Sequence, residues 1–209
     1  MSSYPSDVAF TPTVKAIQQR KGSRAAYERM ERSRGWATEI TQDLAQFIAE
    51  QRSVFIASVS SDGAPYIQHR GGPPGFLKVT GPTTLAFVDY KGNRQFISQG
   101  NLEQNPKAHL FLADYANRQR VKIWGEARVI EGDDELIEQL MPSDYRARPE
   151  QVIEFSVAAW DVNCPQHIPQ RFEAEDVQRE LDQRDARIAE LEAELAALRV
   201  PKNPSGTQE

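Results

Sequence analysis

The chain has 209 residues, of which 39% are hydrophobic and 26% are charged, so it can hold one globular domain of ordinary size plus tails. Its formal net charge of −5 argues against general binding to nucleic acid or to anionic membranes, although 25 lysines and arginines leave room for a local basic pocket. No stretch approaches the roughly 20 apolar residues that a membrane span needs.

The N-terminal segment, residues 1–40, is expected to form an arm. Met1–Phe10 is polar and lacks the charged and apolar regions of a signal peptide, which favours a cytoplasmic protein. A helical pattern follows over Lys15–Arg34, but Gly22 interrupts it and Gly35 ends it.

Apolar segments with turn signals between them predict an antiparallel β-domain over residues 41–172. A helix with Thr41 as its N-cap comes first, over about Thr41–Gln51. Shorter helices are expected at Ile97–Leu102 and at Asp134–Leu140, the latter capped by Asp133. The predicted strands are Val54–Val59, Tyr66–Arg70, Phe76–Val79, Thr84–Val88, Ala108–Leu112, Val121–Ile130 and Val152–Val162. The fold class is therefore mainly β with flanking helices, a small barrel rather than a βαβ array.

The C-terminal segment 173–200 predicts an amphipathic helix, and residues 201–209 are expected to be disordered. The helix is either docked on its own barrel or paired in a two-stranded coiled coil between subunits, and the narrow seam favours the coiled coil. The seam positions alternate in steps of four and three: Val177, Leu181, Arg184, Ile188, Leu191, Leu195 and Leu198.

The first candidate ligand-binding segment is Gln68–Phe76, which holds three glycines and two prolines within five residues. Such a sequence shapes a rigid loop in which backbone amides approach a flat or anionic ligand. Arg70, beside His69, adds a forked cation suited to phosphate or a carbonyl group. A structural bulge with a surface arginine is the alternative.

The second segment, Asp89–Phe96, joins a strand to a helix. Lys91 and Arg94 bracket a Gly-Asn turn where the helix's free N–H groups would point outward, so a phosphate would meet two cations and the helix dipole. The glycine spacing of a Walker loop is absent. A polar turn with solvated charges is the alternative reading.

The third segment, Asn117–Gly125, alternates Arg118, Arg120 and Lys122, so that their side chains share one face of a predicted strand. Cations concentrated on one strand of an acidic protein indicate an anion site, with a solvated strand face as the alternative.

The ordered set Arg-Gly-Gly-Pro-Pro-Gly-Phe, Gly-Asn-Arg, Gly-Asn-Leu-x-x-Asn-Pro and Arg-Val-x-x-x-Gly-x-Ala resembles the pyridoxamine 5′-phosphate oxidase-like FMN-binding family, over about Val54–Ile130 and more weakly to Phe172. The resemblance implies an FMN-binding split β-barrel that forms a homodimer, with FMN in clefts at the subunit interface. It implies that FMN is bound by residues of all three segments and of the helix that follows the second one: His69, Arg70, Gly71, Gly72, Lys91, Asn93, Arg94, Gln95, Gln99, Asn101, Gln119 and Arg120.

The function expected from this resemblance is an FMN-dependent oxidoreductase that exchanges a hydride or electrons between a nicotinamide cofactor and a small-molecule acceptor. The glycine-rich insert and the missing Arg-Leu-x-Pro ending depart from the oxidase itself, so pyridoxamine phosphate is not the expected substrate. One alternative is a non-catalytic flavin- or haem-binding sensor or carrier. Another, a flavin-free assembly module, leaves the cationic segments unexplained.

The single cysteine, Cys164, excludes an internal disulfide framework, and the three histidines lack metal-ligand spacing. Cys164 and His167 lie in a proline-bounded loop after the last predicted strand. Three roles are open to them: a reactive thiol–imidazole pair, a loop that closes over the cofactor, or packing of the chain. No residue is assigned as catalytic.

Overall fold

The computed structural model describes residues 4–162 and 164–199. They fall into two compact units, residues 1–168 and 169–209. The first unit contains seven strands, five α-helices and one 3₁₀ helix, and the second contains one long helix. The tail predicted to be disordered, residues 201–209, lies outside the described residues.

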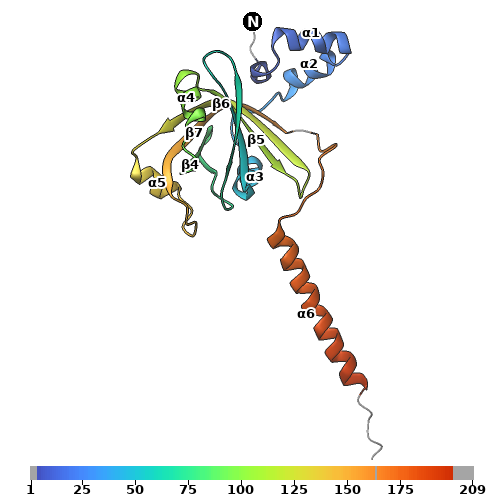
Figure 1. Ribbon diagram of the computed structural model, residues 1–209. Coiled ribbons are helices and arrows are strands. Elements are labelled where there is room, and N and C mark those ends of the chain that lie inside the picture. Colours follow the sequence, from blue (N-terminus) through green and yellow to red (C-terminus); the bar gives the residue numbers. More distant parts are fainter. Residues whose placement is uncertain (1–3, 163, 200–209) are drawn as a thin grey trace, which may run out of the picture. The chain divides into compact units, whose positions relative to one another are not determined.

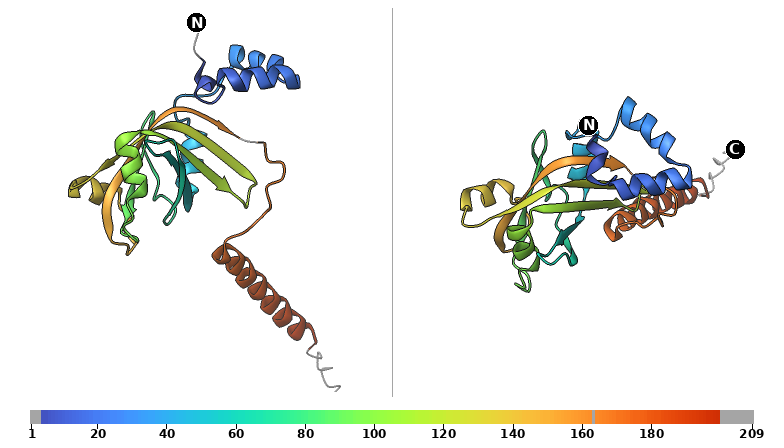
Figure 2. Two further views of the ribbon diagram at one scale, coloured as in Figure 1. Left: turned by 45° about the horizontal axis from the view of Figure 1, so that its top comes forward. Right: turned by 90° about the horizontal axis from the view of Figure 1, so that it is seen from above.

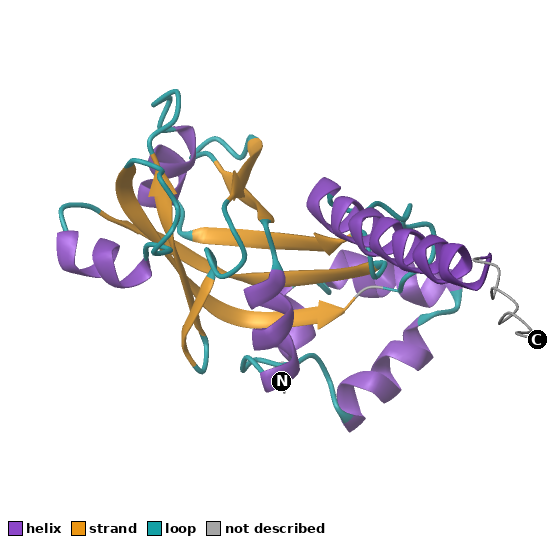
Figure 3. Cartoon of the chain, turned by 90° about the horizontal axis from the view of Figure 1, so that it is seen from below, coloured by secondary structure: helices purple, strands orange, loops and turns teal. Residues whose placement is uncertain are grey.

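The seven strands form one antiparallel sheet in the order β2-β1-β5-β6-β7-β4-β3. The sheet bends strongly on itself (Figures 1 and 3), which confirms the predicted split-barrel fold, mainly β with flanking helices. The strands are β1 Ser53–Val59, β2 Pro65–Gly71, β3 Lys78–Gly81, β4 Thr84–Tyr90, β5 Lys107–Asp114, β6 Gln119–Ile130 and β7 Pro149–Val162.

The period-2 alternation of the strands fills the inside of the bent sheet with apolar side chains. Along β1, for example, Val54 and Ile56 are fully buried, whereas Phe55 lies half-buried on the other face. The long strands β6 and β7 cross closely at Gly125, where an added Cβ would lie 2.0 Å from the carbonyl oxygen of Ser156. Only glycine fits this crossing, and the pairing register shifts there.

The helices of the first unit lie around the bent sheet (Figure 2). As predicted, the Thr41 and Asp133 side chains cap helices by accepting hydrogen bonds from the backbone N–H groups of Leu44 (3.3 Å) and Leu136 (2.9 Å). The helices of the first unit are η1 Pro5–Val8, α1 Pro12–Lys21, α2 Arg24–Ser33, α3 Gln42–Glu50, α4 Ile97–Gln104 and α5 Asp134–Leu140.

Three sequence predictions need local correction. Phe76 and Leu77, predicted in a strand, precede β3 and are buried, because their loop packs into the core. Pro149, predicted in a loop, is the first residue of β7, a strand position that tolerates the missing N–H. Arg118 lies in the turn before β6 with φ 55°, so it does not share the strand face with Arg120.

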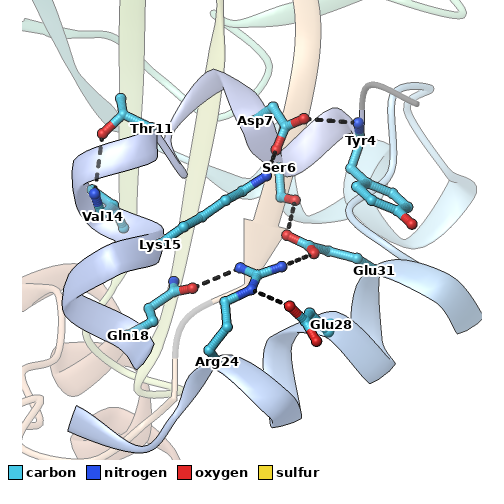
Figure 4. A network of polar contacts seen from close by, with 10 residues as sticks. All are labelled: Tyr4, Ser6, Asp7, Thr11, Val14, Lys15, Gln18, Arg24, Glu28 and Glu31. Carbon is cyan, nitrogen blue, oxygen red and sulfur yellow. Dashed lines mark hydrogen bonds and ion pairs between the residues drawn. The ribbon is translucent and has the colours of Figure 1, made fainter. Parts of the chain in front are cut away.

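The N-terminal arm is held together by a buried polar network (Figure 4). Arg24 Nη1 donates to Gln18 Oε1 (2.7 Å), and Arg24 Nη2 pairs with Glu31, which also accepts from Ser6 Oγ at 3.0 Å. The arm ends on the sheet, since Ala37 forms a β-bridge with Trp160 of β7.

The second unit consists mainly of α6, Ala174–Arg199. Its 26 residues form a continuous helix, and none of them is buried.

Candidate functional site

A cavity of about 380 Å³ opens where β2, the end of β4, the segment 91–96 and the start of α4 meet the start of β7. This volume lies in the range of small-molecule sites. The sequence-predicted residues that line it are His69, Arg70, Gly71, Asn93, Arg94, Gln95 and Gln99. Two separate predicted segments therefore meet at one place.

Arg70 forms the inner charged group of the cavity, facing Asp89 at the end of β4. Arg70 Nε lies 2.5 Å from Asp89 Oδ1, and Gln151 Nε2 donates to Asp89 Oδ2 at 3.2 Å. Both charged side chains are largely shielded from water, so this ion pair is screened less than a surface pair. The pair fixes the direction of the guanidinium inside the cavity.

Two polar atoms of the cavity wall are buried and have no hydrogen-bond partner among the described residues, Arg70 Nε and Tyr90 Oη. The Arg70 Nε contact with Asp89 is an ion pair whose geometry is not that of a hydrogen bond. Burial raises the pKa of Tyr90 above its ordinary value, and Tyr145 adds to the shift, so the phenol keeps its proton at neutral pH. Unpaired buried donors are unfavourable unless a ligand or water completes them.

The segment 91–96 carries the outer charge. Arg94 and Phe96 both adopt left-handed backbone, with φ 57° and 53°, a conformation that is rare for residues other than glycine. Asn93 Oδ1 accepts from the N–H of Gln95 at 3.3 Å, which tightens the turn between β4 and α4. The turn directs Arg94 outward, and its Nε pairs with Glu150 at 2.9 Å.

The two arginines of the cavity differ in how far their side chains are exposed to water. Arg94 is 55% exposed in its side chain, whereas Arg70 is 22% exposed. An exposed ion pair contributes about 0–1 kcal/mol, so the Arg94–Glu150 contact can be exchanged for an anion at little expense. The cavity thus combines one fixed and one exchangeable cation.

Five predicted residues do not line this cavity. Gly72 packs under Phe76, where an added Cβ would lie 2.6 Å from the Phe76 Cβ, and the backbone N–H of Lys91 binds the carbonyl of Arg148. The remaining predicted residues that lie elsewhere are Asn101, Gln119 and Arg120.

The positions of these three follow from their elements. Asn101 is buried in α4 and donates to Ser58 Oγ at 3.0 Å, a bond that ties the helix to β1. Gln119 pairs with Asp114 next to the turn of the β5–β6 hairpin. Arg120 lies one residue further along β6, at a second cavity.

This second cavity, of about 820 Å³, lies between the N-terminal arm and the outer face of β6 and β7. Trp36 stacks on Trp124 with ring centroids 4.6 Å apart, and Lys122 Nζ lies 5.2 Å from the Trp124 ring. Arg120 Nη2 donates to the carbonyl of Cys164 at 3.1 Å, while its buried Nε has no hydrogen-bond partner in the described part of the chain. Arg120 and Lys122 therefore lie together, apart from Arg70 and Arg94.

Sequence reasoning missed several residues of the first cavity. Asp89, Tyr90, Glu150 and Gln151 line it, but none was a predicted site residue. The sequence position of Asp89 and Tyr90, directly before the cationic turn, could have predicted their place in the cavity. No sequence feature could have predicted Glu150 and Gln151, because the pairing of β4 with β7 brings them there from about 60 residues away along the sequence.

The fold and the cavity belong to a known family. The family model for pyridoxamine 5′-phosphate oxidase matches residues 40–164, more than half of the chain. The chain is therefore a member of the pyridoxamine 5′-phosphate oxidase family, as the sequence resemblance indicated. No curated protein matches the chain.

Several solved structures are similar to the chain. HupZ of Group A Streptococcus is 18% identical with a TM-score of 0.49, covering 64% of this chain and 99% of HupZ. An FMN-binding protein from Syntrophomonas wolfei is 11% identical with a TM-score of 0.46, covering 70% of this chain and 97% of its own. A general stress protein 26-related protein of Clostridium acetobutylicum is 13% identical with a TM-score of 0.43, covering 63% and 92%.

Among the described residues, no group of three or more histidine, cysteine or acidic side chains could hold a metal ion. Within the same part of the chain, no helix is both long and apolar enough to cross a membrane.

Proposed function

We infer that the chain is a flavoprotein that binds FMN in the first cavity and transfers electrons through it. The observation that carries this inference is the buried Tyr90 Oη, which has no hydrogen-bond partner among the described residues and lies in the same cavity wall as the Arg70 guanidinium that Asp89 holds. A flavin ring carries carbonyl oxygens and ring nitrogens that accept hydrogen bonds. Membership of the family narrows the choice of ligand to a flavin.

The phosphate of FMN fits the outer end of the cavity. Arg94 is exposed and only weakly paired there, and the first residues of α4, Ile97 and Ser98, also line the cavity. Free N–H groups and the helix dipole favour an anion at this helix terminus. Asn93 and Gln95 hold the turn that positions both features.

The inner end suits the flavin ring. Arg70 is fixed by Asp89, and Tyr90 holds a proton to donate, so both groups can orient a planar acceptor without moving. Bound FMN supplies hydride and electron transfer, while the protein orients and tunes it. His69 and Gly71 shape the adjoining wall from β2.

A second subunit is part of the proposal. The outward side chains of β1 and β5 include the half-buried Phe55 and Phe111, so this face of the sheet is apolar as well as the core face. Such a face suits a subunit interface. Gln119 and Arg120 lie outside the first cavity of their own chain, and we assign them to the FMN site of the other subunit in a homodimer.

Substitution of Arg94 tests the phosphate site. Arg94→Ala is expected to weaken FMN binding by about 1–3 kcal/mol, or roughly 5- to 150-fold, because a charge-assisted contact is lost. Arg128→Ala is the matched control, since Arg128 Nε pairs with Glu154 at 2.7 Å and neither residue lines the cavity. Affinity is measured by the quenching of FMN fluorescence. Equal losses in both variants, or no FMN binding by the unaltered protein, contradict the proposal.

The electron-transfer role needs a separate measurement. Anaerobic NADPH is expected to bleach the absorbance of the bound flavin near roughly 450 nm, and a small-molecule acceptor is expected to restore it. A flavin that binds but is not reduced by NADPH or NADH would instead identify a flavin carrier or sensor.

A further inference from the structure

The second unit leaves one stripe of apolar side chains in contact with water. Val177, Leu181, Ile188, Leu191, Leu195 and Leu198 of α6 are between 41% and 82% exposed. Together with Arg184, which lies between Leu181 and Ile188, they follow alternating steps of four and three residues, which places them on one narrow side of the helix. Helices of proteins obtain most of their stability from packing such a stripe, so a helix of 26 residues with no buried side chain is incomplete.

The heptad positions follow from the spacing. Ala174, Leu181, Ile188 and Leu195 occupy the a positions, while Val177, Arg184, Leu191 and Leu198 occupy the d positions. The flanking g positions are Glu180, Arg187 and Glu194, and the flanking e positions are Gln178, Asp185, Glu192 and Arg199. These flanking charges set the orientation of a partner helix.

A parallel partner with the same sequence matches these charges. In a parallel pair, each g residue lies beside the e residue five positions later on the other helix. Arg187 then faces Glu192, and Glu194 faces Arg199, so two opposite-charge contacts form on each side of the pair. Arg187 already pairs with Glu190 within its own helix, and a second carboxylate extends that pair.

The charges disfavour an antiparallel pair. That arrangement places e residues against e residues and g residues against g residues. With Leu181 opposite Leu191, Asp185 faces Asp185, Glu180 faces Glu194 and Arg187 faces Arg187. Like charges at this distance repel.

Arg184 is the only polar residue in the seam, and it fits the parallel arrangement as well. In a parallel pair, a d side chain packs beside the e residue of the partner, here the acidic Asp185. The parallel pair has one unfavourable contact, between Glu180 and Asp185 of the partner helix. Arg184 lies four residues after Glu180 in the same helix, so its positive charge offsets the repulsion between these two carboxylates. A buried polar residue of this kind fixes the register at some loss of stability.

We propose that α6 is a parallel, in-register coiled coil with α6 of a second copy of this chain. The interface is separate from the apolar sheet face assigned above to the barrel dimer, and it does not depend on FMN binding. Because the barrel is also expected to dimerise, the molecular mass alone does not test the coiled coil. A residue-specific cross-link does.

Cross-linking through single cysteines tests both pairing and orientation in the full chain. The background variant Cys164→Ser removes the one native cysteine, which is exposed. Leu191→Cys at a d position is expected to form disulfide-linked dimers at least tenfold more than Ala189→Cys, which lies on the outer side of the same turn. The measurement is the dimer fraction on a non-reducing gel after equilibration in a glutathione buffer.

Two outcomes overturn the proposal. If Leu191→Cys cross-links no more than Ala189→Cys, the helices do not pair through this seam. If cross-links form only when Leu181→Cys and Leu191→Cys proteins are mixed, the pair is antiparallel, because those positions face each other in that orientation.

Charge reversal supplies a second, independent readout. Arg187→Glu in the Leu191→Cys protein is expected to lower cross-linking several-fold, and adding Glu192→Arg is expected to restore it, since the pair is then reversed rather than broken. Failure of the double variant to recover overturns the parallel register. Circular dichroism at 222 nm checks that each variant keeps the helix.

Discussion

Two parts of the barrel unit bury an arginine beside a carboxylate, and they differ in how completely their polar atoms are paired. In the N-terminal arm, Arg24 is shared among Gln18, Glu28 and Glu31 (Figure 4). In the first cavity, Asp89 holds Arg70 in an ion pair, yet the nearby buried Tyr90 Oη lacks a hydrogen-bond partner among the described residues.

The difference separates a structural network from a binding site. Buried polar groups are normally satisfied by the protein itself, as in the arm. A wall that holds its charge in place but leaves donors unpaired is prepared for a polar ligand. Mutations in the arm network should therefore lower the free energy of unfolding, whereas mutations in the first cavity should mainly change the affinity for FMN.

The largest effect is expected from Glu31→Ala in the arm. It leaves Arg24 buried without its main counter-ion, and removal of one partner of a buried pair lowers stability by about 3–5 kcal/mol. Hydrogen exchange of the α1 and α2 amides measures this loss. Glu28→Ala is the control, because that pair is at i,i+4 and half-exposed, with an expected loss of about 0.2–0.5 kcal/mol. A similar small loss for both variants would show that the network does not stabilise the arm.

A smaller effect, with opposite signs for folding and binding, is expected from Tyr90→Phe. Removing a buried hydroxyl that lacks a partner raises the stability of the ligand-free protein by about 1 kcal/mol, and it weakens FMN binding by about 0.5–1.5 kcal/mol. Urea unfolding and FMN titration measure the two quantities, with Tyr145→Phe as the control for ring packing. A loss of ligand-free stability would mean that the hydroxyl is already paired.

The smallest effect is expected from Glu150→Gln, which releases Arg94. FMN binding should tighten by at most about 1 kcal/mol, because an exposed ion pair is worth no more than that. The gain should shrink as salt is added. Glu154→Gln releases Arg128 in the same way and should leave the affinity unchanged. Weaker FMN binding by Glu150→Gln would instead make Glu150 a ligand contact.

The sequence predicted the fold well because its cues were local. Apolar runs bounded by turn signals marked the strands, alternation marked β6, and the caps Thr41 and Asp133 marked α3 and α5. The family followed from the order of its motifs.

The site was predicted in part, and the errors have a common physical cause. Arg70 and Arg94 belong to segments with strong local signals, and the structure brings both to one cavity. Glu150 and Gln151 arrive through the pairing of β4 with β7, which no local pattern encodes. Arg120 looked similar to Arg70 along the chain, but β6 carries it to the other cavity.

Strand β7 passes both cavities, with Gln151 at the first and Trp160 at the second. Between these positions it supplies Ile153, Phe155 and Ala159 to the core. At Ser156 its backbone packs closely against Gly125 of β6. Inserting or deleting one residue there would turn every later side chain to the opposite face. During evolution this stretch can therefore change its amino acids far more freely than its length, whereas the turns of the barrel can change both.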